Sequence, residues 1–171
     1  DDYNVGLYSA ATKINKIVLS VVTAGTTILL PRLAYYFKNE GFDKFKELAY
    51  KGFDILLLIS IPCAVGLNIV SKNATLLLSG KSFIEAIPVM KIMNPIIVIT
   101  GLSGFIGSQI FIPLNKEKWT LMSVLTGVLV NITLNAIFVP LYGAKGAAIG
   151  TICSETTVFI INTILLSRVI N

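Results

Sequence analysis

Five long runs of apolar residues limit what this chain can fold into. Each run holds about the 20 residues that a helix needs to cross the hydrocarbon core of a bilayer. Over half of the residues are hydrophobic and only 13% are charged, whereas a soluble domain of this length needs more charge to cover its surface. We therefore expect an all-α, polytopic integral membrane bundle that forms a single domain over residues 1–171. The five expected transmembrane helices cover about residues 10–37, 53–71, 92–115, 119–141 and 146–168.

The residue types that the chain lacks exclude several classes of function. It has no His, and Cys63 and Cys153 lie far apart inside apolar runs, which argues against a metal site and a disulfide framework. We therefore expect no catalytic residue, no metal and no other cofactor, and a protein that is not an enzyme. The basic residues behind the net charge of +5 are scattered between apolar runs without an aromatic stacking surface, so nucleic acid is not expected as a partner. The chain starts at Asp1 without Met or a signal peptide, and we expect it to be an internal piece of a longer protein.

Basic residues between the runs predict an orientation in the membrane. The connection from Arg32 to Lys51 holds five of the fourteen basic residues, and its apolar residues are typical of an amphipathic helix that lies on the membrane surface. The positive-inside rule places this connection in the cytoplasm. Alternation of the spans then gives the sides of the other connections. Lys116, Lys118 and Arg168 are expected inside, and Lys72, Lys81 and Lys145 outside.

A polar stripe runs along the first apolar run. Its members recur at steps of three and four residues, which at ~100° per residue places them on an arc of about 80° of one helix. A cationic side chain that faces lipid at the bilayer centre costs at least ~2.5 kcal/mol, so the two lysines favour a face turned toward a water-filled cavity or a polar ligand. The alternative is that both lysines lie near the outer end and snorkel to the interface. The stripe consists of Ser9, Lys13, Lys16, Ser20, Thr23 and Thr27.

Other polar residues inside the runs are candidates for function with structural alternatives. Glu155, near the middle of the last run, is interpreted as a proton-coupling site, as a partner for one of the stripe lysines, or as a structural, protonated carboxyl group. Asn131 and Asn135 lie four residues apart and have the chemistry to bind sugar hydroxyls, although asparagines that join helices are more common. Lys91 and Asn94, at the start of the third run, are further cavity candidates.

Proline and small residues predict where helices bend and touch. Pro62 and Pro95 lie inside the second and third runs and are expected to kink them, which membrane helices tolerate. Small residues at steps of three or four allow close approach of two backbones. Such residues are Gly101, Gly104 and Gly107 in the third run and Gly146, Gly150 and Ser154 in the fifth.

Three parts of the chain resemble one family of transporters. The run from Ile137 to Thr151 is similar to a helix–turn–helix of polysaccharide flippases in the multidrug/oligosaccharidyl-lipid/polysaccharide exporter superfamily. The segment from Val5 to Ile14, followed by Leu29 to Leu33, and the segment from Leu76 to Ala86 resemble other stretches of the same proteins, in the same order. The resemblance covers nearly the whole chain. It implies helices eight to twelve of a protein with twelve to fourteen, which is most of the second of two lobes around a central cavity.

The resemblance also implies an activity. Such flippases move undecaprenyl-pyrophosphate-linked oligosaccharides, the repeat units of O-antigen in lipopolysaccharide or of capsule, from the cytoplasmic to the outer leaflet by alternating access. The implied location is the cytoplasmic membrane of a bacterium or archaeon. The implied partners are membrane lipid, the lipid-linked oligosaccharide and the missing N-terminal lobe of the same protein.

Two other functions remain open at this point. A cation-coupled multidrug antiporter of the same superfamily predicts apolar cavity walls with carboxylates. A non-transporting membrane assembly component predicts a dry stripe packed on a partner helix. The candidate cavity-lining residues are Lys13, Lys16, Ser20, Thr23, Thr27, Lys91, Asn131 and Asn135, and the candidate coupling residue is Glu155.

Overall fold

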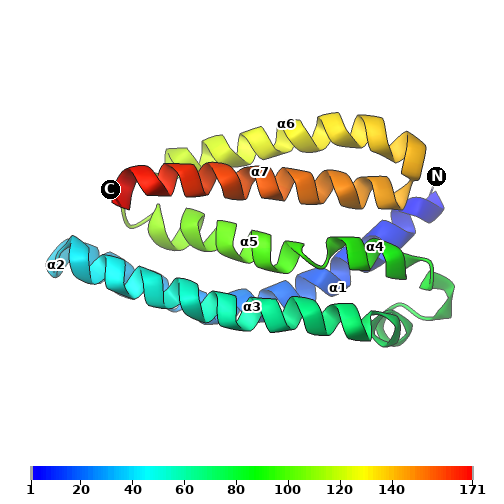
Figure 1. The fold of residues 1–171 in the computed structure, drawn as a ribbon, viewed down its shortest axis with the longest axis horizontal. Helices are drawn as coiled ribbons and strands as arrows, with labels where there is room; N and C mark the ends of the chain where they lie inside the picture. The colour runs from blue at the N-terminus through cyan, green and yellow to red at the C-terminus, as the bar shows by residue number, and fades with distance from the viewer. Residues whose placement is uncertain (1, 171) are drawn as a thin grey trace.

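The computed structural model describes residues 2–170 and shows a bundle of long helices that run side by side (Figure 1). Within the described residues there is no strand, which confirms the all-α prediction. A single 3₁₀ turn, η1 (Lys81–Phe83), lies in the connection before α4, and a π-helix, η2 (Phe105–Ile110), directly continues α5. The helices are α1 (Asp2–Thr27), α2 (Leu29–Asn39), α3 (Phe42–Leu78), α4 (Ala86–Met93), α5 (Ile96–Gly104), α6 (Glu117–Tyr142) and α7 (Ala144–Ile170).

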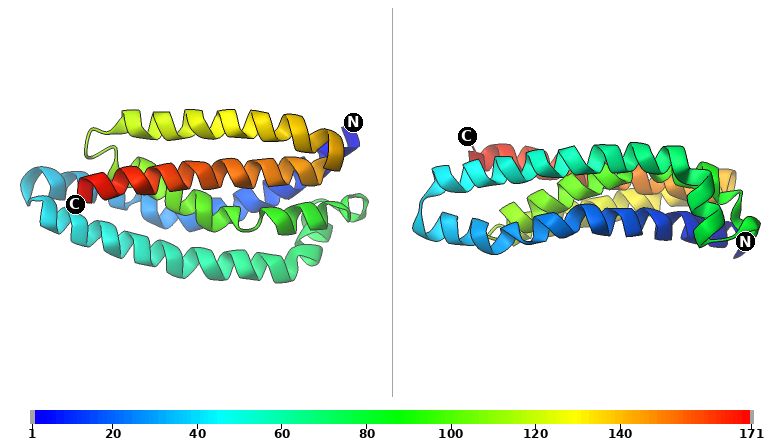
Figure 2. Two further views of the ribbon diagram at one scale, coloured as in Figure 1. Left: turned by 45° about the horizontal axis from the view of Figure 1, so that its top comes forward. Right: turned by 90° about the horizontal axis from the view of Figure 1, so that it is seen from below.

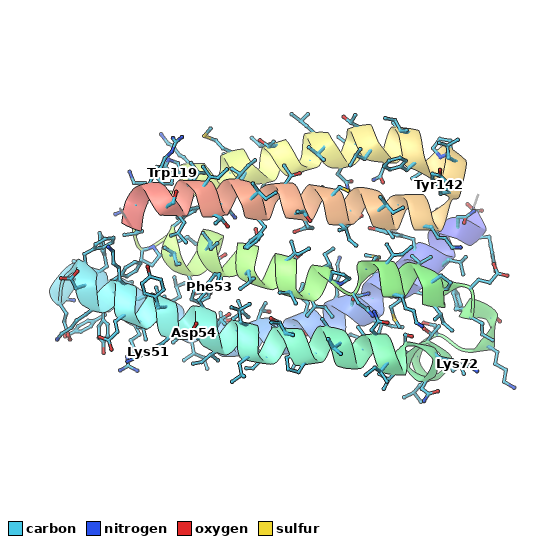
Figure 3. All side chains as sticks on the ribbon, in the orientation of Figure 1. Lys51, Phe53, Asp54, Lys72, Trp119 and Tyr142 are labelled. Atoms are coloured by element: carbon cyan, nitrogen blue, oxygen red, sulfur yellow. The ribbon has the colours of Figure 1, made fainter. Side chains whose placement is uncertain are left out.

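Four helices, or five if the bent pair of α4 and α5–η2 counts as one span, are long and apolar enough to cross a membrane. Four are continuous or nearly so: α1 with α2, then α3, α6 and α7. The fifth consists of α4 and α5–η2, which are bent by 42° at a short break. Pro95 lies at this break, so the predicted kink is confirmed there, whereas α3 continues past Pro62 to Leu78. The last turns of α3, near Lys72, turn away from the rest of that helix (Figures 2 and 3).

The prediction of a surface helix between the first two spans is wrong. Instead, α2 and α3 form a helical hairpin, and the turn between them lies at Gly41, which has a φ of 94°. Phe37, Phe42 and Phe45 pack against one another there, with ring centroids 5.7–6.4 Å apart. Because these aromatic side chains contact protein, they do not need a lipid surface. At ~1.5 Å per residue, α3 is about 55 Å long, so part of the α2–α3 hairpin projects beyond a hydrocarbon core of ~30 Å.

The two ends of the bundle differ in what they contain. The first end, called here the α2–α3 end, holds the α2–α3 turn, the connection between η2 and α6, and the C-terminus of α7 (Figure 1). Lys51 and Trp119 lie toward this end, and Lys72 and Tyr142 lie toward the opposite one (Figure 3). The opposite end also holds the first turn of α1, where the Asn4 side-chain oxygen accepts a hydrogen bond of 3.1 Å from the Ala144 N–H of α7.

Close approach between α6 and α7 depends on glycine. A Cβ added at Gly146 would lie 2.1 Å from the Phe138 carbonyl oxygen, and one added at Gly150 would lie 2.5 Å from Asn135 Oδ1. The small residues of the fifth span therefore mark a helix contact, as predicted. In the third span, an added Cβ at Gly107 would meet Thr120, and one at Gly101 would lie in ordinary contact with Leu56 and Leu19 of neighbouring helices. Gly104 has open space beside it, and the expectation for that residue was wrong.

Candidate functional site

A polar groove of about 510 Å³ opens between α1, α5–η2, α6 and α7. It exists because α1 packs on α3, α4, α5 and α7, and α6 packs mainly on α7 and more weakly on η2, so that α1 and α6 stay apart. Helix α7 and the α5–η2 segment form its floor. Valines from α6 and α7 interrupt the polar lining. That lining includes Tyr8, Thr100, Ser103, Thr120, Asn131 and Glu155.

Hydrogen bonds between helices hold the polar side chains of the groove in place. The Thr100 hydroxyl of α5 donates to Glu155 Oε2 of α7 at 2.9 Å. Tyr8 of α1 and Thr151 of α7 share a hydrogen bond of 2.8 Å between their hydroxyl groups. A stripe lysine is one predicted partner of Glu155, but within the described residues neither Lys13 nor Lys16 forms an ion pair with it; Lys44 pairs with Glu40 and Lys51 with Glu47 near the α2–α3 turn. In the structure, Glu155 is therefore held by a neutral hydroxyl.

The buried Asn162 amide joins α7 to α5 at the floor of the groove. Its nitrogen donates to the Ser103 carbonyl oxygen at 3.2 Å and approaches the Ser103 hydroxyl at 3.1 Å. Next to it, the π-helix η2 has a widened turn, in which the Phe111 N–H donates to the Ile106 carbonyl at 3.0 Å. The Thr120 hydroxyl of α6 donates to the Gly107 carbonyl of this segment at 3.1 Å. π-helical turns occur mostly as single insertions, often at functional sites.

The polar stripe of α1 faces out of the bundle on the face that adjoins Tyr8. Lys13, Lys16 and Ser20 are exposed, and the helix buries Ile14 and Val22 on its opposite side. Three of the four stripe hydroxyls donate to carbonyls of the preceding turn, from Ser20 to Ile17 at 2.7 Å, from Thr23 to Leu19 at 2.9 Å and from Thr27 to Thr23 at 3.0 Å. These bonds satisfy the donors within the helix. The evidence for a polar environment on this face of α1 therefore comes from Lys13 and Lys16.

The depth of the two lysines follows from the contact between Tyr8 and Thr151. Helices α1 and α7 start at the same end of the bundle, and this hydrogen bond sets the level at which they are matched. Counting ~1.5 Å per residue from there, Lys13 and Lys16 lie about 18 and 22 Å from the start of α7, which is itself about 40 Å long. Both lysines are level with the middle of α7.

The remaining candidates divide between the groove and the surface. Asn135 Nδ2 donates to Asn131 Oδ1 at 2.9 Å, and Asn131 Nδ2 donates to the Ser154 hydroxyl at 3.3 Å. Asn131 thus links α6 to α7 and lines the groove, whereas Asn135 donates within α6 and its Oδ1 lies beside Gly150 of α7. Lys91 is exposed on α4 and does not line the groove.

Asn94 is 1% exposed and does not line the groove; it lines a separate, mostly apolar pocket with residues of α3 such as Asn68. With its amide oriented to satisfy its neighbours, it donates to Asn15 Oδ1 of α1 at 3.1 Å and to the Met90 carbonyl at 2.9 Å. Asn94 therefore fastens the break before Pro95 to the first helix. A buried amide in this position stabilises the bundle.

Sequence reasoning missed most of the groove. Thr100, Ser103 and Gly107 recur at steps of three and four on one side of the third span, and this pattern was interpreted only through its glycines as a helix contact. A stripe of small and polar residues is also what a groove floor requires. The sequence around Tyr8 does not indicate that it lines a groove, because its position there depends on where α7 packs.

The comparisons with known proteins agree with this architecture. The sequence matches the family described as lipid II flippase MurJ over residues 7–170, nearly its full length. The chain belongs to the lipid II flippase MurJ family. The lipid II flippase MurJ of Bacillus subtilis (strain 168) is 21% identical over 159 residues, which are 91% of this chain and 29% of that protein. The probable low-salt glycan biosynthesis flippase Agl15 of Haloferax volcanii is 22% identical over 162 residues, 95% of this chain and 33% of that protein.

The chain thus spans about a third of the length of these curated relatives. A search of solved structures gave no significant match. Membership of the MurJ family confirms the expectation of a multi-pass membrane protein in a flippase family for lipid-linked substrates, and it places the chain with transporters rather than enzymes. The narrower expectation of an O-antigen or capsule repeat unit as substrate stays a prediction.

Proposed function

We propose that this chain forms the greater part of one lobe of a flippase that moves a polyprenyl-pyrophosphate-linked oligosaccharide across the cytoplasmic membrane of a bacterium or archaeon. The observation that carries the proposal is the position of Lys13 and Lys16 on the free face of α1, level with the middle of α7. A lysine facing lipid at this depth costs at least ~2.5 kcal/mol, and two double the cost. A cavity shared with the other lobe removes that cost and gives both lysines an anionic ligand.

The proposed transport cycle follows from the two polar surfaces. Lys13 and Lys16 attract the pyrophosphate, and the hydroxyl oxygens of the stripe accept hydrogen bonds from sugars. The groove beside Tyr8 and Asn131 adds further polar groups for the saccharide. The lobe rocks against its missing N-terminal counterpart, so that the cavity opens first to one side and then to the other. The lipid tail stays in the membrane, and no covalent bond changes.

We infer that the saccharide is a polysaccharide repeat unit carried on undecaprenyl pyrophosphate. The support is the sequence resemblance to repeat-unit flippases, while the two curated relatives are named for lipid II and for a low-salt glycan. Complementation separates these substrates. The full-length protein is expected to restore surface polysaccharide in a strain that lacks its repeat-unit flippase. Rescue of a strain that lacks its lipid II flippase, without rescue of the first strain, would assign lipid II instead.

The headgroup-binding role of the lysines is tested by changing their charge in the full-length protein. The double variant Lys13→Gln/Lys16→Gln is expected to lose most flipping while it remains inserted, because the attraction for the pyrophosphate is gone. The double Arg variant should retain much activity, since Arg also binds phosphate, and the double Glu variant should be the most damaged, since repulsion is added.

The matched control is Lys72→Gln/Lys81→Gln, which removes the same charge from exposed positions near the opposite end of the bundle. Flipping is measured by complementation and normalised to the amount of protein in the membrane. Full activity of the Lys13→Gln/Lys16→Gln variant would refute the headgroup-binding role. A loss that only follows protein abundance would assign the lysines to anchoring at an interface.

A further inference from the structure

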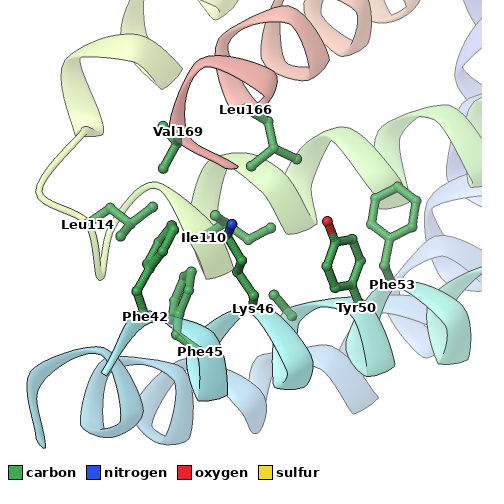
Figure 4. A pocket seen from close by; sticks show the side chains of 10 residues that line it. Phe42, Phe45, Lys46, Tyr50, Phe53, Ile110, Leu114, Leu166 and Val169 are labelled. Carbon is green, nitrogen blue, oxygen red and sulfur yellow. The ribbon is translucent and has the colours of Figure 1, made fainter. Parts of the chain in front are cut away.

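A second cavity, unlike the polar groove, lies at the α2–α3 end of the bundle. It has a volume of about 170 Å³ and lies between the first turns of α3, the end of η2 with the loop after it, and the last turns of α7 (Figure 4). Its walls are almost entirely apolar. The proposed transport cycle makes no use of it. The side chains that form its walls include Phe42, Phe45, Phe53, Ile110, Leu166 and Val169.

The cavity has a cation at its mouth. Lys46 and Tyr50 both extend from α3 into the space between α3 and α7, and their polar atoms lie above the apolar lining (Figure 4). The Lys46 ammonium lies 4.9 Å from the centre of the Phe42 ring, a cation–π contact that keeps it beside the lining. Apolar walls with one ammonium and one phenol at the rim match an amphipathic ligand with an anionic head.

The size of the cavity restricts what can enter. A dry apolar cavity of ~150 Å³ in a soluble protein binds a molecule as small as benzene. A cavity of about 170 Å³ therefore takes a short stretch of one hydrocarbon chain, and a packed helix is too wide. In a membrane, lipid chains surround such a site at high concentration.

The charge of this end of the bundle favours an anionic lipid. The connections and helix ends here hold eight basic residues against five acidic ones. Basic residues close to a membrane surface attract anionic lipids. A zwitterionic headgroup carries a cation of its own, which Lys46 repels. Its electrostatic attraction to the basic residues at this end is therefore weaker. The acidic residues here are Glu40, Asp43, Glu47, Asp54 and Glu117, and the basic ones are Arg32, Lys38, Lys44, Lys46, Lys51, Lys116, Lys118 and Arg168.

We propose that this cavity holds part of one acyl chain of an anionic membrane phospholipid, whose phosphate is bound by the Lys46 ammonium and the Tyr50 hydroxyl. The lipid fills the space between the first turns of α3 and the last turns of α7, beside η2 and the loop after it. It is thus a structural ligand of the lobe and is distinct from the transported lipid. The site stands whether or not the lysine stripe of α1 binds the substrate.

The test uses the full-length protein, purified and titrated with phosphatidylglycerol or with phosphatidylcholine of the same chain length, with bound lipid counted by native mass spectrometry. We expect the tightest site to prefer phosphatidylglycerol by roughly tenfold. Lys46→Gln should reduce this preference to nearly one. The matched control Lys51→Gln, on the same helix but outside the cavity, should keep it. Equal losses in the two variants would show diffuse surface charge and overturn the proposal.

A second pair of variants tests the cavity itself. Leu166→Trp places a large ring in the cavity and should reduce retention of both phospholipids at the tightest site, whereas Ser167→Trp, at the next and exposed position, should leave it unchanged. Identical binding by these two variants would overturn the cavity as the site. Displacement of phosphatidylglycerol from the unaltered protein by equimolar undecaprenyl phosphate would assign the cavity to the substrate lipid and also overturn the proposal. If Leu166→Trp fails to fold, the comparison of Lys46→Gln with Lys51→Gln decides alone.

Discussion

Substitution of Gly127 tests the close contact between α6 and α7 through its effect on the stability of the protein. A Cβ added at Gly127 would lie 2.4 Å from Cγ2 of Val158, about 1 Å closer than carbon atoms normally approach. Forcing an extra methyl group into a packed contact costs ~1–3 kcal/mol. Replacing glycine by alanine inside a helix returns up to ~1 kcal/mol. Gly127→Ala is therefore expected to destabilise the protein by up to ~2 kcal/mol.

In the Val158→Ala background, the effect of Gly127→Ala on the free energy of unfolding should change sign. Val158→Ala removes the atom that the new Cβ would meet, and the nearest remaining neighbour, the Ser154 carbonyl oxygen, lies 3.4 Å away at ordinary contact distance. In that background, Gly127→Ala should keep the gain in helix propensity and stabilise the protein by up to ~1 kcal/mol. The coupling free energy between the two positions is then ~1–3 kcal/mol, within the range for residues in direct contact.

Unfolding of the full-length protein in detergent, driven by SDS or by heat, measures all four members of this cycle. The control is Gly66→Ala on α3, where nothing lies within 4 Å of the added Cβ, so it should be neutral or stabilising in both backgrounds. Equal destabilisation by Gly127→Ala with and without Val158→Ala would refute the contact on which the reasoning rests.

Two further predictions concern the polar surfaces. Cysteines introduced at Ser20 and Thr23 in the full-length protein are expected to react with a small polar thiol reagent, because the proposed cavity gives water access to the stripe. A cysteine at Val21, exposed on an apolar face of α1, should not react, and equal labelling would contradict the cavity. Glu155 is the one carboxylate among the described residues that line the groove. Glu155→Gln keeps an acceptor for the Thr100 hydroxyl but cannot ionise, so transport should lose its dependence on external pH while insertion is unchanged; an unaltered pH profile would exclude a coupling role.

The spans were predictable from sequence because the run of apolar residues alone determines which segments enter a membrane. The kink at Pro95 was equally predictable, since a proline removes a helix hydrogen bond wherever it lies in the helix. The α2–α3 hairpin was not predictable in the same way. Phe42 and Phe45 produce the same amphipathic pattern whether they meet lipid or Phe37 of the neighbouring helix. Only tertiary structure distinguishes these two cases.

The site divides in a similar way. The lysine stripe was visible because all its members lie on one helix, so spacing alone places them on one face. The groove was hidden because its walls come from four helices, and their relative rotation is set by contacts such as Gly150 against Asn135. The depth of Lys13 required the hydrogen bond between Tyr8 and Thr151, two residues 143 positions apart.

The bond from the Ala144 N–H to Asn4 has a consequence for the biogenesis of the protein. Ala144 is the first residue of α7, so its N–H has no acceptor within its own helix, and Asn4 supplies one from α1, which is synthesised earlier. About 140 residues separate the two, which at 5–20 residues per second is roughly 7–28 s of synthesis. During that interval α1 waits in the bilayer without its contacts to α7. A nascent chain that stalls before α7 therefore presents α1 to membrane chaperones and proteases before it has docked on α7, and the described bundle is completed at the end that holds the first turn of α1.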